Sequence, residues 1–484
     1  MEDALKYYLE NTIVKKAAIE SRLTHPITKL RYPARLVFSD LKKYTDDFLK
    51  SGSEPRFISL SGLRGVGKTT LLWQTANYIY SKYQKEIYFF NVNILKNLGV
   101  DLYSALEAFQ QHIIKKRFNE LSEPITLFFD EVHDDENWSQ TLKILYDEAR
   151  TAFILCSGSS ALLLNQTADL ARRMRVERIF PFKFTEFVAA KTYLERQGKM
   201  VYPDESVAGE LYESIFYSET AQEAISRIIS ISEKVQDYFQ LTEAGNSLRP
   251  HDLWQGYVRY QNIPGFLFFK EKYTVNDSIR DLFKRVILED IPKLKPDYTD
   301  YTKIERLILR LAGSDEINPE KLAGLVGVKQ NEINEMIDIL SKAELITVLS
   351  PYGGLDSRIF KNKKAFFMSP SLRSALLSTL YGINLPTQFE SKLIEDTIVM
   401  YLRIILKDAI ISFSSRVNES NPDFVIETRD KPIILETGTG KTSARQIAAS
   451  FIDSRYGVLV SQGITKPSLK DNCIRLPLNW FLLL

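Results

Sequence analysis

One short segment of the chain combines glycines, a lysine and a threonine at the spacing of a phosphate-binding loop. Residues 62–69 read GLRGVGKT and fit the pattern GxxxxGK followed by Ser or Thr. The apolar residues 57–60 before it have the length of a buried strand, and a helical pattern begins at about Thr69. Backbone N–H groups of a loop in this context converge on phosphate oxygens at the positive end of the helix. We therefore predict that a nucleotide is bound by Gly62, Leu63, Arg64, Gly65, Val66, Gly67, Lys68, Thr69 and Thr70.

A second segment, residues 125–131, ends an apolar run with two carboxylates and reads ITLFFDE. Lys68 would contact the outer phosphates as a point charge, while the Thr69 hydroxyl and Asp130 would hold Mg²⁺. Glu131 would orient or deprotonate the attacking water. The two segments together predict catalysis of nucleoside triphosphate hydrolysis. The lack of an NKxD-type guanine motif favours ATP as the nucleotide.

Further polar groups follow a third apolar run at residues 153–156. The Ser157 hydroxyl would reach the γ-phosphate from a neighbouring strand, and Arg172 or Arg173 would stabilise the charge of the transition state. A plain turn at Ser157 and a solvated basic helix end at the arginines are the alternatives. The sequence does not choose between these interpretations, nor does it say which arginine acts.

The elements around these motifs indicate an α/β fold. Strands are expected at 57–60, 87–92, 125–129 and 153–156, with helices near 102–118 and 137–150. This alternation predicts a parallel sheet with helices on both faces. Because 484 residues exceed one hydrophobic core, we expect several domains. Their expected ranges are an N-terminal helical segment at 1–35, a P-loop ATPase core at 36–200, a helical lid or connector at 201–299, a winged helix at 300–355 and a C-terminal α/β domain at 356–484.

The winged-helix prediction rests on three helical patterns at 301–312, 319–326 and 330–343, followed by a strand-like run at 345–349. A third helix of this kind can lie in the major groove of DNA. Residues 300–345, however, hold six basic and nine acidic side chains, so phosphates would be repelled. DNA binding and packing between domains both remain open as the role of this module.

Composition predicts a soluble cytoplasmic protein without a membrane partner. The 63 basic and 61 acidic side chains leave a formal charge of +2, which gives no global attraction to nucleic acid or membranes. Cys156 and Cys473 form neither a disulfide framework nor a metal spacing, which suits a reducing compartment. The N-terminal residues lack the blocks of a signal peptide. The longest uncharged stretch, 151–168, is interrupted by polar residues, and we interpret it as a buried strand followed by a loop.

With these motifs the chain resembles a family of prokaryotic AAA-type ATPases, close to the STAND group, that carry a DUF4143-like C-terminal region. The matching stretches include GLRGVGKTT at 62–70, LFFDEVH at 127–133, LCSGSSALLL at 155–164 and PFKFTEF at 181–187. The resemblance implies a sheet with an additional strand, in which the Asp-Glu strand lies beside the loop strand. It also implies that the C-terminal part is related to PD-(D/E)XK nucleases.

That resemblance assigns a second metal site to three carboxylates. Glu395 matches the helix glutamate, Asp423 the metal aspartate and Glu436 the carboxylate of the following strand. Such a set would bind Mg²⁺ for phosphodiester cleavage. The family's Glu-x-Lys reads Glu-Thr-Gly at 436–438, and the next lysine is Lys441. The sequence therefore favours a retained fold with cleavage lost, and a lysine that has migrated to position 441 is the alternative.

These observations lead to one main hypothesis and two alternatives. The main hypothesis is a Mg²⁺-dependent ATPase switch that couples the nucleotide state to the arrangement of its C-terminal domains. The alternatives are an ATP-regulated DNA-binding protein or nuclease, and a module that uses ATP only to assemble on DNA or on a second copy of itself. The expected partners are accordingly ATP and either DNA, another protein or the chain itself.

Overall fold

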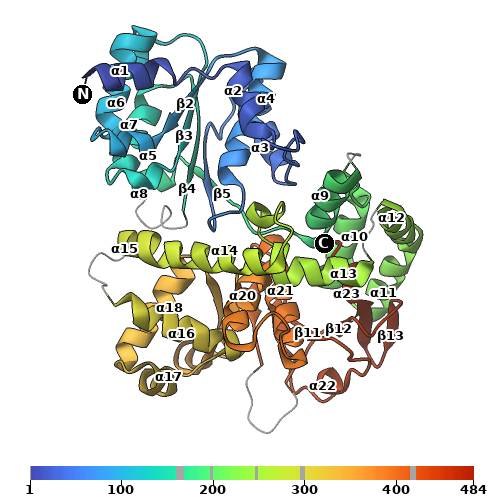
Figure 1. The fold of residues 1–484 in the computed structure, drawn as a ribbon. Helices are drawn as coiled ribbons and strands as arrows, with labels where there is room; N and C mark the ends of the chain where they lie inside the picture. Colours follow the sequence, from blue (N-terminus) through green and yellow to red (C-terminus); the bar gives the residue numbers. More distant parts are fainter. Residues whose placement is uncertain (1, 160–167, 197–199, 246–248, 295–299, 415–420) are drawn as a thin grey trace. The chain divides into compact units, whose positions relative to one another are not determined.

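The computed structural model describes residues 2–159, 168–196, 200–245, 249–294, 300–414 and 421–484. The chain divides into two compact units, residues 1–179 and 180–484, and each is described by itself (Figure 1). The five-part division expected from the sequence stays a prediction. In the described ranges, no helix has the length and apolar character needed to cross a membrane.

The N-terminal unit is built on a five-stranded sheet in which every strand is parallel to its neighbours. The strand order is β2-β3-β4-β1-β5. The strands are β1 (Phe57–Ser61), β2 (Ile87–Asn91), β3 (Ile125–Asp130), β4 (Ala152–Gly158) and β5 (Arg175–Arg178). All residues of β1, β3 and β4 are buried, as expected for a sheet covered on both faces. The predicted α/β class with a parallel sheet is confirmed.

One detail implied by the family resemblance is wrong. The Asp-Glu strand β3 does not lie beside the loop strand β1, because β4 pairs with both and separates them. This order has a physical consequence at the carboxyl ends of the strands. It places the end of β4 between the phosphate-binding loop and the acidic end of β3, so a side chain of β4 can reach both.

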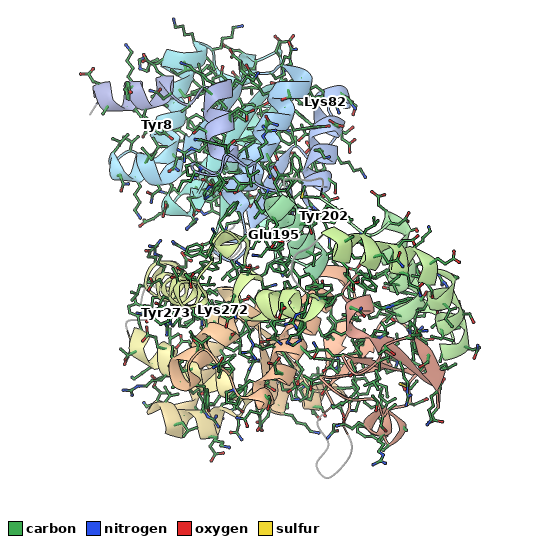
Figure 2. The ribbon with its side chains drawn as sticks, turned by 45° about the vertical axis from the view of Figure 1, so that its right-hand side comes forward. Tyr8, Lys82, Glu195, Tyr202, Lys272 and Tyr273 are labelled. Carbon is green, nitrogen blue, oxygen red and sulfur yellow. The ribbon has the colours of Figure 1, made fainter. Side chains whose placement is uncertain are left out.

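Helices cover the two faces of this sheet. Figure 1 shows α1, α5, α6 and α7 on one face and α2, α3 and α4 on the other. Their bounds are α1 (Glu2–Glu10), α2 (Lys16–Leu23), α3 (Phe38–Ser51), α4 (Lys68–Tyr83), α5 (Val92–Asn97), α6 (Leu102–Phe109), α7 (Trp138–Glu148) and α8 (Ala168–Ala171). The Tyr8 hydroxyl, labelled in Figure 2, accepts from the Asn91 N–H at 2.8 Å and joins α1 to the end of β2. On the other face, Lys82 at the end of α4 pairs with Asp46 of α3 at 2.8 Å.

The second unit begins with helices, as the sequence predicts for residues 203–260. The helices are α9 (Phe184–Arg196), α10 (Glu205–Tyr217), α11 (Ala221–Ser230), α12 (Ser232–Gly245), α13 (Pro250–Gly256), α14 (Lys272–Arg285) and α15 (Ile291–Leu294). One apolar core runs from these helices to the C-terminal residues, so they are part of a single folded body with the rest of the unit.

Residues 301–367 contain a three-helix module (α16, α17 and α18), a further short helix (α19) and a small antiparallel sheet of order β6-β8-β7. The elements are α16 (Tyr301–Gly313), β6 (Glu316–Ile317), α17 (Pro319–Val326), α18 (Gln330–Lys342), β7 (Ile346–Leu349), α19 (Leu355–Phe360) and β8 (Lys363–Phe367). Local sequence sets the bounds of α17, because the Asn318 side chain caps its first turn and Gly327 ends it in a left-handed conformation. Strands β6 and β8 were not anticipated from the sequence.

The C-terminal part holds a six-stranded mixed sheet of order β13-β14-β12-β11-β10-β9. Strands β11, β12 and β14 are parallel, whereas β9, β10 and β13 run antiparallel to their neighbours. The elements are α20 (Pro370–Tyr381), α21 (Glu390–Ile405), β9 (Ile410–Ser412), β10 (Phe424–Glu427), β11 (Ile433–Gly438), α22 (Arg445–Ala448), β12 (Gly457–Ser461), β13 (Ser468–Lys470), β14 (Cys473–Pro477) and α23 (Leu478–Phe481).

A buried ion pair fixes the helices of this unit against one another. The Arg373 guanidinium on α20 donates to both carboxylate oxygens of Asp396 on α21, at 2.6 and 2.8 Å, and both side chains have no solvent exposure. The same guanidinium donates to the Ala312 carbonyl oxygen at the end of α16, at 3.0 Å. Asp396 also accepts from the Phe367 N–H of β8 at 2.8 Å. Two side chains thus connect four elements, and each buried charge depends on the other.

We expect Arg373→Met to destabilise the second unit by about 3 to 5 kcal/mol, because it leaves the Asp396 carboxylate buried without its partner. Urea unfolding followed by circular dichroism measures the change. The matched control is Arg249→Met, since Arg249 is 82% exposed and its pair with Asp252 lies on the surface. Its free energy of unfolding should change by no more than about 0.5 kcal/mol. Equal losses in the two variants would contradict the role given to the buried pair.

Candidate nucleotide site

The phosphate-binding loop connects β1 to α4, and two of its glycines are required by its geometry. Gly67 precedes α4 in a left-handed conformation, with φ of 94°. A Cβ on Gly62 would lie 2.3 Å from the Ile179 carbonyl oxygen, too close for any side chain. Ile179 is held there because its N–H donates to the Ser61 carbonyl oxygen at 2.7 Å. The end of β5 therefore lies directly against the loop and leaves room only for glycine.

Lys68 is buried and its ammonium group is turned onto the loop itself. Its Nζ donates to the carbonyl oxygens of Gly62 at 2.7 Å and Leu63 at 3.2 Å. Arg35, which precedes α3, donates to the Val66 carbonyl oxygen at 2.8 Å and supports the loop from outside. The loop carbonyls thus accept the hydrogen bonds that Lys68 would donate to phosphate oxygens. Arg35 was missed in the sequence, because nothing in the motif points to a residue so far before it.

Asp130 lies at the end of β3 and is 4% exposed. The Thr69 hydroxyl at the start of α4 lies 3.1 Å from both of its carboxylate oxygens, and the Ser157 hydroxyl at the end of β4 also donates to it. Burial raises the pKa of Asp130, against the hydrogen bonds from Ser157 and Thr69 and the charge of Lys68. The structure thus brings together Thr69, Asp130 and Ser157. Ser157 lies at the end of its strand, as predicted, and its hydroxyl faces the Asp130 carboxylate.

Glu131 has a left-handed backbone, with φ of 58° and ψ of 44°. Its carboxylate lies 3.4 Å from His133 Nε2, and the Ser159 N–H donates to His133 Nδ1 at 3.3 Å. Because Nδ1 accepts a hydrogen bond, Nε2 carries the proton that faces Glu131. Burial raises the pKa of Glu131, and the charges of Lys68 and Arg64 oppose that rise. The buried His133 therefore orients the predicted catalytic carboxylate.

His133 was missed although it stands in the segment LFFDEVH, two residues after the glutamate. Only its contacts reveal a role, since a histidine after a strand is as often a packing residue. Arg22 of α2 was missed as well. Its positive charge opposes the rise in the Asp130 pKa, and its guanidinium lies 5.9 Å from the centre of the Trp73 ring.

The structure places the two predicted arginines on the surface after α8. Arg173 pairs with Asp147 of α7 at 2.8 Å and donates to the Asp169 carbonyl oxygen at 2.7 Å. Arg172 is exposed. The contacts described for Arg173 thus belong to α7 and α8 rather than to the phosphate-binding loop. A role for either residue in stabilising the transition state stays a prediction.

The three carboxylates assigned to the C-terminal part lie near one another. The Asp423 N–H donates to the Glu436 carboxylate at 3.2 Å, and the Thr437 N–H donates to the Asp423 carboxylate at 2.7 Å. Burial and then the charge of Asp423 raise the pKa of Glu395 to about 8 and that of Glu436 to about 7. Within the described ranges, no three acidic, histidine or cysteine side chains stand close enough together to form a ready metal site.

The Lys441 side chain reaches this cluster although its backbone lies beyond the end of β11. Its ammonium contacts the Glu436 carboxylate and donates to the Gln446 amide oxygen at 3.1 Å. Burial opposes the charge of Lys441, but the hydrogen bond to Glu436 and the charge of Asp423 outweigh it and raise the pKa of Lys441. A Cβ at Gly438 would lie 2.6 Å from Lys441 Cγ. The glycine at the usual lysine position is therefore what lets Lys441 fold back.

Comparisons with known proteins agree with the first site. Residues 54–188 match the family model of an AAA domain, and residues 266–381 match a domain of unknown function (DUF8612). The second match differs from the DUF4143-like region that the sequence resembles. The chain is 28% identical to the uncharacterized protein MJ1637 of Methanocaldococcus jannaschii over 487 residues, which cover 99% of this chain and 94% of the relative.

Two solved structures with which the chain was compared are weakly similar to it. The RuvB Holliday junction branch migration motor of Thermotoga maritima has a TM-score of 0.27 at 15% identity, over 65% of this chain and 92% of that one. The Orc1 protein of Aeropyrum pernix in complex with DNA has a TM-score of 0.32 at 11% identity, over 76% and 97%. Scores this low support no further conclusion. The AAA-domain match and the loop geometry support an ATP-binding domain of AAA type over residues 54–188.

We expect Gly62→Ala to weaken nucleotide binding at least about tenfold, because the new methyl group must displace either the loop or the Ile179 carbonyl. Equilibrium binding of a fluorescent, non-hydrolysable ATP analogue measures the effect. Gly209→Ala on α10 is the matched control, since a Cβ there meets nothing within 4 Å. Binding by the Gly62 variant as tight as by the control would show that the loop tolerates a side chain at this position.

Proposed function

We propose that the protein is a Mg²⁺-dependent ATP-binding and hydrolysing switch of the AAA/STAND type. The observation that carries the proposal is the convergence of Lys68, Thr69, Asp130 and Glu131 at the carboxyl edge of one parallel sheet, with Ser157 between them. Each of these groups has the chemistry that phosphoryl transfer from ATP to water requires. The AAA-domain match over the same residues supports it.

The donor set fits Mg²⁺, which prefers hydroxyl and carboxylate oxygens. Thr69 and Asp130 would hold the ion, and its chemistry there is to neutralise charge on the phosphates. Arriving phosphate oxygens would replace the loop carbonyls as acceptors for Lys68. Glu131 would take the proton from the attacking water, as a carboxylate whose raised pKa makes it a better base.

The contact between His133 and Glu131 supports the switch character of the site. The contact with His133 orients the Glu131 carboxylate within the site. Release of Glu131 from His133 on nucleotide binding would give the site two discrete arrangements, and ATP would shift the balance by binding one of them better. The conformation that the second unit adopts in each state would then depend on the nucleotide.

The nature of the partner follows from the charge of the three-helix module. Helix α18, the one that would enter a DNA groove in a winged helix, buries Ile333, Met336 and Leu340. Its polar residues include Glu332 and Asp338, of which Asp338 pairs with Lys342 on the same helix. This acidic surface favours a protein partner, or a second copy of the chain, over the DNA backbone.

A second candidate function, metal-dependent phosphodiester cleavage, is favoured by one observation. The lysine that the sequence lacks at position 438 reaches Glu436 from position 441. The carboxylates of Glu395, Asp423 and Glu436 have the chemistry of Mg²⁺ ligands, although the described side chains must shift to bind one ion together. When bound, Mg²⁺ would activate a water for attack on phosphorus. Lys441 would stabilise the negative charge of that nucleophile.

ATP hydrolysis tests the main proposal. We expect Lys68→Ala to lose nucleotide binding, and Glu131→Gln to bind ATP while hydrolysing it about 100-fold or more slowly, because general-base catalysis is removed. Both are measured as phosphate release and as retained nucleotide, with and without duplex or single-stranded DNA. Unchanged nucleotide binding by the Lys68 variant would remove the loop from the site. Hydrolysis at the parent rate by the Glu131 variant would remove that residue from the chemistry.

Nuclease assays test the second candidate. If the cluster is active, Mg²⁺-dependent cleavage of DNA or RNA should be lost in Asp423→Asn and fall about 100-fold or more in Lys441→Met, because the charge facing the nucleophile is gone. Lys470→Met, on the edge strand β13, is the matched control. The absence of cleavage of single-stranded, duplex and branched substrates by the parent protein would exclude this function and leave the ATPase proposal untouched.

A further inference from the structure

A cavity in the second unit lies outside both sites described so far. Its volume is about 420 Å³, within the range of roughly 300 to 1,000 Å³ that small-molecule sites occupy. Helices α9, α12 and α13 contribute one part of its wall, and α23 with the segment after β12 contributes the other. Because all of these elements belong to one continuous apolar core, the cavity is a feature of a single folded body.

Aromatic and aliphatic side chains form the interior of this cavity. The aromatic rings are those of Phe184, Tyr238, Phe239 and Trp254, and the aliphatic groups include Leu478 and Leu482. The rings of Phe184 and Trp254 meet edge to face, with centroids 6.0 Å apart. The indole N–H of Trp254 is buried and finds no acceptor among the described side chains and backbone.

Polar side chains also line the cavity. They are exposed and comprise Glu243, His251, Gln462, Thr465 and Asn479. Each amide side chain offers both a donor and an acceptor. Amides of this kind recognise the hydrogen-bonding edge of a heterocycle, while aromatic rings stack on its face. An apolar, aromatic interior with an amide-bearing rim therefore suits a flat ligand with polar edge atoms.

One of these polar residues, Gln462, lies at a defined place on the six-stranded sheet. Strands β11 and β12 are parallel, with Gly438 opposite Ser461, so both end at the same edge. The Gln462 N–H donates to the Gly438 carbonyl oxygen at 3.3 Å. The segment after β12, which contains Gln462, thus lies beside the carboxyl end of β11.

We propose that this cavity binds a planar heteroaromatic base, which stacks against the aromatic wall and pairs through its edge with the amides of Gln462 and Asn479. Two sources share this chemistry, a free nucleoside and an unpaired base of a nucleic acid strand. The inference goes beyond the ATPase, since it uses no residue of the phosphate-binding loop. The inference does not require phosphodiester cleavage either, because the experiment measures only the binding of the base.

Calorimetric titration of the full-length Lys68→Ala protein tests the proposal, with adenosine, guanosine, cytidine, uridine, a short single-stranded oligodeoxynucleotide and its duplex as probes. The Lys68→Ala change keeps nucleotide binding at the phosphate-binding loop from contributing to the measured heat. Adding Phe239→Leu retains apolar volume but removes a stacking face, and should weaken binding at least about tenfold. Adding Asn479→Trp should block the opening. The matched control adds Phe360→Leu, which alters a phenylalanine that is 79% exposed and outside the cavity.

Binding of a nucleoside that is weakened by Phe239→Leu or Asn479→Trp, but not by Phe360→Leu, supports the proposal with a free ligand as the source. Binding only of the single strand, with the same dependence on the variants, supports it with a nucleic acid as the source. Saturable binding of none of the probes up to millimolar concentration overturns the proposal, as does binding that both cavity variants leave unchanged. Thermal melts confirm that the variants fold, and parallel ATP hydrolysis by the parent protein keeps the outcome separate from that of the ATPase.

Discussion

The free-energy cost of burying the Asp130 carboxylate constrains the arrangement of the N-terminal unit. Asp130 is almost fully shielded from solvent at the end of β3, where an ionised group is stable only with hydrogen-bond donors and a positive charge nearby. Thr69 supplies one donor from the start of α4 and Ser157 supplies another from the end of β4. The ends of β3 and β4 and the start of α4 must therefore meet at the same point of the sheet. The insertion of β4 between β1 and β3 is the strand order that makes this convergence possible.

In the second unit, an ion pair offsets the free-energy cost of burying a carboxylate. Asp396 is compensated by Arg373 on the neighbouring helix and by the Phe367 N–H of β8. This pairing fixes the rotation of α21 about its axis. Glu395, the residue before Asp396 in the chain, is thereby held where the charge of Asp423 acts on it. A structural salt bridge on one face of α21 thus positions a functional candidate on another.

The lysine of the C-terminal cluster shows how sequence spacing can mislead. Position 438 is a glycine, and in the motif that glycine indicates a lost catalytic lysine. In the folded chain the same glycine removes the side chain that would block Lys441 from reaching Glu436. Whether a residue is absent from a site depends on where its charged end lies, because a long flexible side chain can enter from several backbone positions.

The sequence by itself determined the α/β class, the phosphate-binding loop and the acidic end of β3, because glycine spacing, strand-length apolar runs and paired carboxylates are local patterns with few structural solutions. It also placed β1 to β4 and the helices α16, α17 and α18 within a few residues. Only the tertiary structure decided that β4 separates β1 from β3, that His133 holds Glu131, that Arg35 supports the loop and that aromatic residues of α12 and α13 enclose a cavity with the C-terminal residues. These features join residues far apart in the chain or depend on side-chain direction, and neither property leaves a periodic trace in the sequence.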